Sequence, residues 1–252
     1  MKKILIAVIS AFILSFPGWA SESLLDKADK ELENQNWKDA FYLYKKILLE
    51  DKASTLVYQN AVKCLTKARL QNEFDGFFSA VARKYAKDPE MATVLAGSKM
   101  RVADYGYIIA GEFVRGPHRG GGEQVSCLER DRVEALRLLF PFADEATRKG
   151  AEVKKRFYET LSGILIWGRE GDEAWKLQYL TDLNKLPDYE KKEFSYLRNR
   201  PQGAPVGPDG KPVFYRVPDE FKAAFNDGER WRRVMAVLTD DESIPESFRL
   251  NA

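Results

Sequence analysis

The sequence has little of the chemistry on which most enzymes and metal proteins depend. It holds one histidine, His118, and two cysteines, Cys64 and Cys127, among 252 residues. A single imidazole leaves only one candidate base for a Ser-His-Asp or Cys-His arrangement, and it weakens any zinc site built from several imidazoles. No run of alternating oxygen ligands around a central glycine predicts a calcium loop. We therefore expect no resident metal, no cofactor and a non-enzymatic protein.

An excess of charge of one sign is also lacking. The chain carries 40 Lys and Arg against 38 Asp and Glu, and the charges are interspersed without a basic stripe. Loss of an N-terminal signal with Lys2 and Lys3 would leave 38 against 38. Electrostatic attraction to nucleic acid or to an anionic membrane therefore has no support in the sequence.

Long hydrophobic runs are lacking except at the start. Two lysines precede an apolar run from Ile4 to Phe16, and the small residues Gly18 and Ala20 follow. This is the three-part pattern of a secretory signal peptide. The stretch up to Ala20 is shorter than the roughly 20 apolar residues of a membrane span, and Pro17 interrupts it. We expect a signal peptide over 1–20, cleavage after Ala20, a periplasmic or secreted protein and no membrane span after cleavage.

The two cysteines would then lie in an oxidising compartment. Cys64 and Cys127 are candidates for a disulfide, although their separation in the sequence says nothing about geometry. Buried free thiols are the alternative, since Cys64 falls on the apolar face of a predicted helix and a thiol there behaves as a small hydrophobe.

Residues 21–106 predict stacked helical hairpins. Apolar residues recur at helical spacing from Leu24 to Leu32, from Trp37 to Leu49, and on both sides of a second break at 71–73. The breaks at Asn34–Asn36 and Gln71–Glu73 lie about one repeat apart, and a further helix is expected over about 90–105.

Two such hairpins resemble tetratricopeptide repeats, whose unit is a helix pair of roughly 34 residues. The likeness is clearest in the second helices, in Trp37-Lys38-Asp39-Ala40 with Tyr44 and in Phe74-Asp75-Gly76. The resemblance implies that hairpins stack to bury apolar faces that a single pair cannot bury alone. An irregular helical bundle is the alternative.

Residues 107–128 predict a glycine-rich connector. Its segment from Arg115 to Gly122 places Arg115, His118 and Arg119 among glycines, where guanidinium groups and backbone amides favour a phosphate or carboxylate. One interpretation of this segment is therefore a small-anion binder or enzyme centred on these three residues. The other interpretation is a flexible connector whose charges are solvated.

The remainder predicts helices and one proline-rich arm. The helical region, 129–199, holds apolar stripes that begin near Glu129, Ala151 and Glu173. Residues 200–218 contain five prolines and the turn signal Pro208-Asp209-Gly210, which predicts a short edge hairpin. A last helix over about 219–239 and a polar tail complete 219–252.

Aromatic side chains gather in the last third of the chain. Core packing is the default for them, yet aromatic anchors are also what protein-binding surfaces use. The residues we single out as candidates for contact with a partner protein are Trp175, Tyr179, Tyr189 and Trp231.

Short strings across residues 100–235 resemble the N-terminal helical region of large bacterial alpha-2-macroglobulin-like proteins. They include Glu112-Phe113-Val114-Arg115-Gly116, Glu129-Arg130-Asp131-Arg132, Thr181-Asp182-Leu183 and Asp227-Gly228-Glu229-Arg230. The resemblance implies an exported, non-enzymatic protein connected with protease trapping. The β-sandwich, bait and thioester domains of that family are not in these 252 residues, so trapping itself does not carry over.

These expectations combine into an all-α fold of stacked helical hairpins with a short proline-rich β-hairpin arm near the C-terminus. The predicted function is an exported helical scaffold that binds another envelope protein or an adjoining domain.

Overall fold

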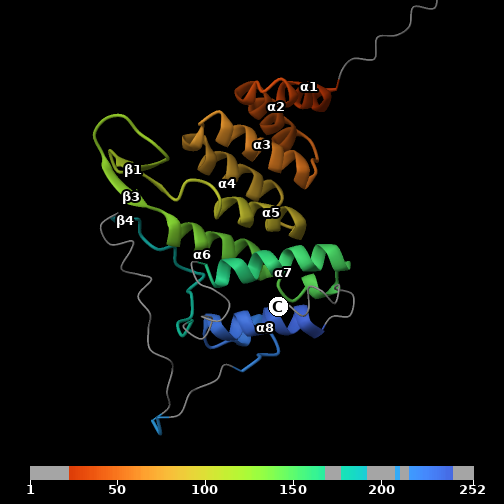
Figure 1. Cartoon of the computed structure of the whole chain (residues 1–252), viewed down its shortest axis with the longest axis vertical. Coiled ribbons are helices and arrows are strands. Elements are labelled where there is room, and N and C mark those ends of the chain that lie inside the picture. Colours follow the sequence, from red (N-terminus) through yellow and green to blue (C-terminus); the bar gives the residue numbers. More distant parts are fainter. Residues whose placement is uncertain (1–22, 168–176, 192–207, 211–215, 241–252) are drawn as a thin grey trace, which may run out of the picture.

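The computed structural model describes residues 23–167, 177–191, 208–210 and 216–240. The predicted signal peptide, 1–20, lies outside this part of the chain. The described residues form eight α-helices and a four-stranded antiparallel sheet. The helices follow one another down the long axis of the molecule, and the sheet projects from one side (Figure 1). None of the described helices is long and apolar enough to cross a bilayer.

The first five helices lie close to the predicted positions, although the fifth ends at Lys99 rather than near 105. They are α1 Leu24–Glu33, α2 Trp37–Glu50, α3 Thr55–Lys67, α4 Phe74–Lys84 and α5 Pro89–Lys99. Local chemistry fixes their starts: Ser23 and Asp26 form a capping box for α1, and Asp88 accepts hydrogen bonds from the amides of Glu90 and Met91 ahead of α5. The helices share one core, to which Phe41, Tyr44, Tyr58, Phe74, Phe77 and Phe78 contribute the largest fully buried side chains.

The sheet corrects the prediction of an all-α fold. It contains β1 Tyr105–Ile109, β2 Glu112–Arg115, β3 Glu123–Ser126 and β4 Glu190–Lys191 in the order β2-β1-β3-β4. Half of the predicted connector, 107–128, is therefore strand rather than loop. Ala110 and Gly111 both have positive φ between β1 and β2, as a tight two-residue hairpin turn requires.

Gly106 explains how the sheet packs. A Cβ at this position would lie 2.5 Å from the ring of Phe113, so only glycine leaves room for that ring to cross β1. The same ring stacks on Tyr189 with centroids 4.4 Å apart, which brings the segment before β4 against the hairpin. The backbone amide of Cys127 donates to the carbonyl of Asp104, so the chain enters and leaves the sheet at one point.

A second core follows the sheet. It is built by α6 Leu128–Leu139, α7 Ala151–Leu165 and α8 Asp227–Asp240, with short 3-10 turns η2 Phe140–Phe142, η3 Ala146–Arg148 and η6 Phe221–Ala223. Helix α6 packs against α5, and α7 also contacts α5, so the second core continues the stack begun by the first (Figure 1).

The helix predicted to begin near Glu173 is wrong where the structure describes it. Residues 177–186 are irregular, because their backbone groups bond to the start of α8. The carbonyls of Leu177 and Tyr179 accept from the amides of Gly228 and Asp227. Most of the proline-rich arm lies outside the described residues; inside them, 208–210 form a turn with Gly210 at positive φ.

Candidate protein-binding groove

Arg115, the first residue of the predicted anion site, is committed to the protein's own carboxylates. Its side chain at the end of β2 is 1% exposed. Nε and Nη2 donate to the two oxygens of Asp75 at 2.8 Å, and Nη1 and Nη2 donate to those of Asp131 at 2.7 and 2.8 Å. Nη1 also donates to the carbonyl of Ala103. The structure therefore gives Arg115 an internal role in place of the predicted external anion.

Lys99 completes this buried cluster from α5. Its Nζ lies 2.8 Å from carboxylate oxygens of Asp75 and Glu134 and 3.4 Å from Asp131. Two cations thus meet three carboxylates that come from α4 and α6. We call Asp75, Lys99, Arg115, Asp131 and Glu134 the ionic cluster; it joins α4, α5, β2 and α6.

Burial and pairing act in opposite directions on the pKa values of the cluster. Burial alone would raise the pKa of Asp75, but hydrogen bonds from Arg115 and the charge of Lys99 outweigh it and hold that pKa below its ordinary value. Burial alone would lower the pKa of Lys99, but the charges of Asp131, Asp75 and Glu134 raise it overall. Asp75 and Lys99 are therefore held in their charged forms at neutral pH.

His118 and Arg119 are not brought to Arg115. His118 is partly buried and its ring lies 5.8 Å from that of Tyr107, while Arg119 is exposed. His118 instead lines a shallow polar depression of about 470 Å³ on the sheet, together with Asp104, Tyr105, Gln124 and Ser126 among others. The three predicted ligands do not converge on one site.

Cys64 and Cys127 are free, buried thiols, so the alternative without a disulfide describes this structure. Cys64 lies in the first core, and burial raises its pKa to about 11. Cys127 lies beside the ionic cluster, where Arg115 Nη1 donates to its sulfur at 3.1 Å. Burial and the nearby charge of Asp131 raise the pKa of Cys127. Both thiols are protonated and inert at neutral pH.

The structure describes three of the four predicted partner-binding aromatics, Tyr179, Tyr189 and Trp231. Tyr189 is stacked on Phe113 and faces Arg130, and Trp231 packs on the second core with its Nε1 donating to Ser162. Tyr179 is 39% exposed, and Trp175 lies outside the described residues. Two of the four candidates therefore serve internal packing.

A second buried polar network holds α8 in place. Asp227, 0% exposed, accepts from the amide and hydroxyl of Thr181 and from Arg230, and its carboxylate lies 3.7 Å from Arg132 of α6. Arg132 also donates to Glu129 and to the Thr181 hydroxyl. The network ties α6, the segment near 181 and α8 together.

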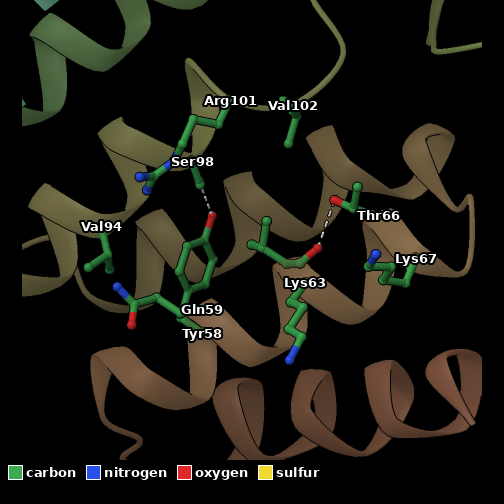
Figure 2. A pocket seen from close by; sticks show the side chains of 10 residues that line it. Tyr58, Gln59, Lys63, Thr66, Lys67, Val94, Ser98, Arg101 and Val102 are labelled. Carbon is green, nitrogen blue, oxygen red and sulfur yellow. Dashed lines mark hydrogen bonds between the residues drawn. The ribbon is translucent and has the colours of Figure 1, made fainter. Parts of the chain in front are cut away.

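The open, unpaired surface lies elsewhere, between α3 and α5. A groove of about 390 Å³ is lined there by Tyr58, Gln59, Val62, Lys63, Thr66, Lys67, Val94, Ser98, Arg101 and Val102. Figure 2 shows Tyr58 reaching from α3 to Ser98 of α5, and their hydroxyl groups lie 2.7 Å apart. This bond satisfies the polar atoms at the floor of the groove, so the surface left for a ligand there is mainly apolar.

Cations surround this groove. Lys63 and Lys67 are one helical turn apart on α3, Arg101 follows α5, and all three side chains are exposed. No lining residue is acidic. In the part of the chain that the structure describes, none of these three cations forms a salt bridge, whereas Lys99 and Arg115 are fully paired.

The groove continues into a second depression between α5 and α7. Its volume is about 270 Å³, and it shares Gln59, Val94 and Arg101 with the first. Gly163 and Trp167 of the α7 side line its far end, and a Cβ added at Gly163 would meet no atom within 4 Å. We call the two depressions together the α3/α5/α7 groove.

Sequence reasoning missed both the ionic cluster and the groove. Lys99 offered one signal, because it lies in a helix that is buried nearly all round, where an unpaired ammonium would be prohibitively costly. Lys63 and Lys67 offered none, since two lysines four residues apart are ordinary on a solvated helix. Among the described residues, no cluster of histidine, cysteine and acidic side chains could hold a metal ion.

A comparison of the chain with protein-family models, curated proteins and solved structures finds no match. The resemblances to tetratricopeptide repeats and to alpha-2-macroglobulin-like proteins therefore rest on the quoted residues alone.

Proposed function

We propose that this protein is an exported, non-enzymatic helical scaffold that binds a segment of another protein in the α3/α5/α7 groove. The observation that supports the proposal most strongly is the groove itself, an exposed and mainly apolar channel with a polar rim. Partner-binding sites combine such an apolar floor with a rim that keeps contact with water.

The rigidity of the groove walls also favours binding. Helix α3 belongs to the first core, and α5 is packed against α6 and α7 as well as against α3. A preformed surface loses little conformational entropy when a ligand binds, so a modest contact area suffices. Stacked helices present extended surfaces of this kind to their partners.

Site-specific photo-crosslinking tests the proposal. A photoreactive amino acid replaces Gln59 or Thr66 in the groove, and Arg83 or Lys27 on other faces, in the cells that naturally produce the chain. We expect one discrete protein adduct from positions 59 and 66 and none from positions 27 and 83. Equal labelling from all four positions, or turnover of a peptide, glycan or ester library by the purified chain, would overturn the proposal.

Two glycines give a matched steric control. Gly163 and Gly76 are both exposed in helices, and neither would clash with an added Cβ, but only Gly163 lines the groove. Gly163→Leu should remove the adduct and Gly76→Leu should leave it. Loss of the adduct in both variants would indicate general destabilisation and would count against the groove as the binding surface.

A further inference from the structure

The chemistry of the groove also specifies its ligand. We infer that it binds a short extended peptide segment with two acidic side chains separated by one apolar residue, an inference that rests on the proposed function. The first argument is charge complementarity: three exposed cations and no acid line the depression between α3 and α5. Because these cations have no carboxylate partner among the described residues, a bound carboxylate would not have to displace one.

The spacing of the cations selects an extended backbone. Lys63 and Lys67 are four residues apart on α3, a rise of roughly 6 Å along the helix. Alternate residues of an extended strand lie roughly 6.6 Å apart on one side. Acidic residues at positions i and i+2 of a segment that runs along α3 would therefore each face one lysine.

The dimensions of the groove agree with a short segment. The lining residues of α3 extend from Tyr58 to Lys67, about 14 Å of helix, which matches roughly four extended residues.

Arg101 marks the point where the segment passes into the second depression. It lines both depressions, and its guanidinium lies over Gly97, where an added Cβ would be 3.1 Å from Nη2. The second depression is mainly apolar, with Trp167 in its lining and with Arg156 and Glu159 as side chains of opposite charge, so it favours an apolar residue next to the acidic pair. The inferred ligand thus carries an apolar residue beside its acidic pair.

A display selection tests the ligand. The purified full chain is the target for a library of random eight-residue segments, and the enriched segments are resynthesised with a fluorescent label for polarisation measurements. We expect acidic-apolar-acidic triplets to be enriched, and binding to weaken with added salt because the contacts are exposed ion pairs.

Charge-reversal variants test whether Lys63 and Lys67 bind the acidic side chains of the ligand. Lys63→Glu with Lys67→Glu should weaken binding of the enriched peptides about tenfold or more, and Lys27→Glu with Arg83→Glu, which lie outside the groove, should not. Peptides whose acidic residues are replaced by Gln should bind the unaltered protein about as weakly as the original peptides bind the charge-reversed protein. Acidic peptides that bind equally well to both variants would overturn the inference.

The remaining outcomes separate this inference from the proposed function. Gln59→Trp places a large side chain at the junction of the two depressions. If enriched segments lack acids but lose binding with Gln59→Trp, the scaffold function stands and the acidic ligand is wrong. If no enriched segment loses binding with Gln59→Trp, both the acidic ligand and the groove as a binding surface are wrong.

Discussion

Arg115 has partners inside the protein that the sequence did not predict. Its position among glycines suggested an external anion, yet the two carboxylates that it binds come from Asp75, forty residues earlier, and from Asp131. Nothing local in the sequence indicates such a pairing, because residues on α4 and α6 meet β2 only after the chain has folded. His118 and Arg119 lie within four residues of Arg115, yet neither joins the cluster. Closeness in the sequence does not decide which side chains meet in the fold.

Replacement of Arg115 should be costly. Arg115→Met would leave the buried carboxylate of Asp131 without its main partner, and breaking a buried ion pair in this way typically costs about 3–5 kcal/mol. Urea unfolding followed by circular dichroism measures the loss. Arg83→Met, at an exposed position of α4, is the control and should change stability by less than about 0.5 kcal/mol. Equal effects of the two substitutions would show that the cluster does not stabilise the fold.

Elements were predictable where local periodicity decides their structure. Helices α1 to α4 carry apolar stripes, and the capping residues Ser23 and Asp88 mark the starts of α1 and α5. The sheet was hidden because glycines that serve a hairpin turn and the crossing of Phe113 also suggest a loop. The segment 177–186 has helical spacing, but α8 takes the carbonyls that its own helix would need, a tertiary effect invisible to local patterns.

Helix α4 offers a simple gain in stability. Gly76 is exposed near its start, and an added Cβ would meet no neighbouring atom within 4 Å. Gly76→Ala should stabilise the protein by about 0.5–1 kcal/mol, since glycine loses more backbone entropy on helix formation than alanine does. Thermal unfolding at fixed pH measures it, and Gly111→Ala, at a positive φ of 87°, should destabilise instead. A neutral or negative result for Gly76→Ala would mean that α4 is strained at this position.

At the scale of the whole molecule, the ionic cluster links the two hydrophobic cores. The ionic cluster joins α4 and α5, which contribute to the first core, to α6 of the second. A linkage of this kind makes the halves unfold together, because opening either one exposes unpaired charges of the other. The same linkage makes stability depend on pH.

Acid should weaken the protein through Asp75. Its pKa is lowered in the folded state, so its contribution is complete above the unfolded value of about 3.9 and is lost as pH falls through the lower folded value. Urea midpoints recorded from pH 6 to pH 2 should decline mainly below about pH 4. Asp75→Asn, less stable at neutral pH, should show a smaller decline over that range. Parallel curves for the two proteins would rule out this carboxyl as a source of acid sensitivity.

The hydrogen bond between Asp104 and Cys127 has a further consequence, for engineering. Because the chain leaves the helical stack and returns to it at that bond while α5 and α6 pack directly on each other, everything from 105 to 126 is an excursion whose ends already meet. The loop between β2 and β3 can therefore accept inserted sequence without altering the path of the helices. Only β2 must keep its length of four residues, because its last residue, Arg115, places a guanidinium group in the interior. A reporter peptide placed among Gly120, Gly121 and Gly122 would be displayed to solvent while the α3/α5/α7 groove stayed intact.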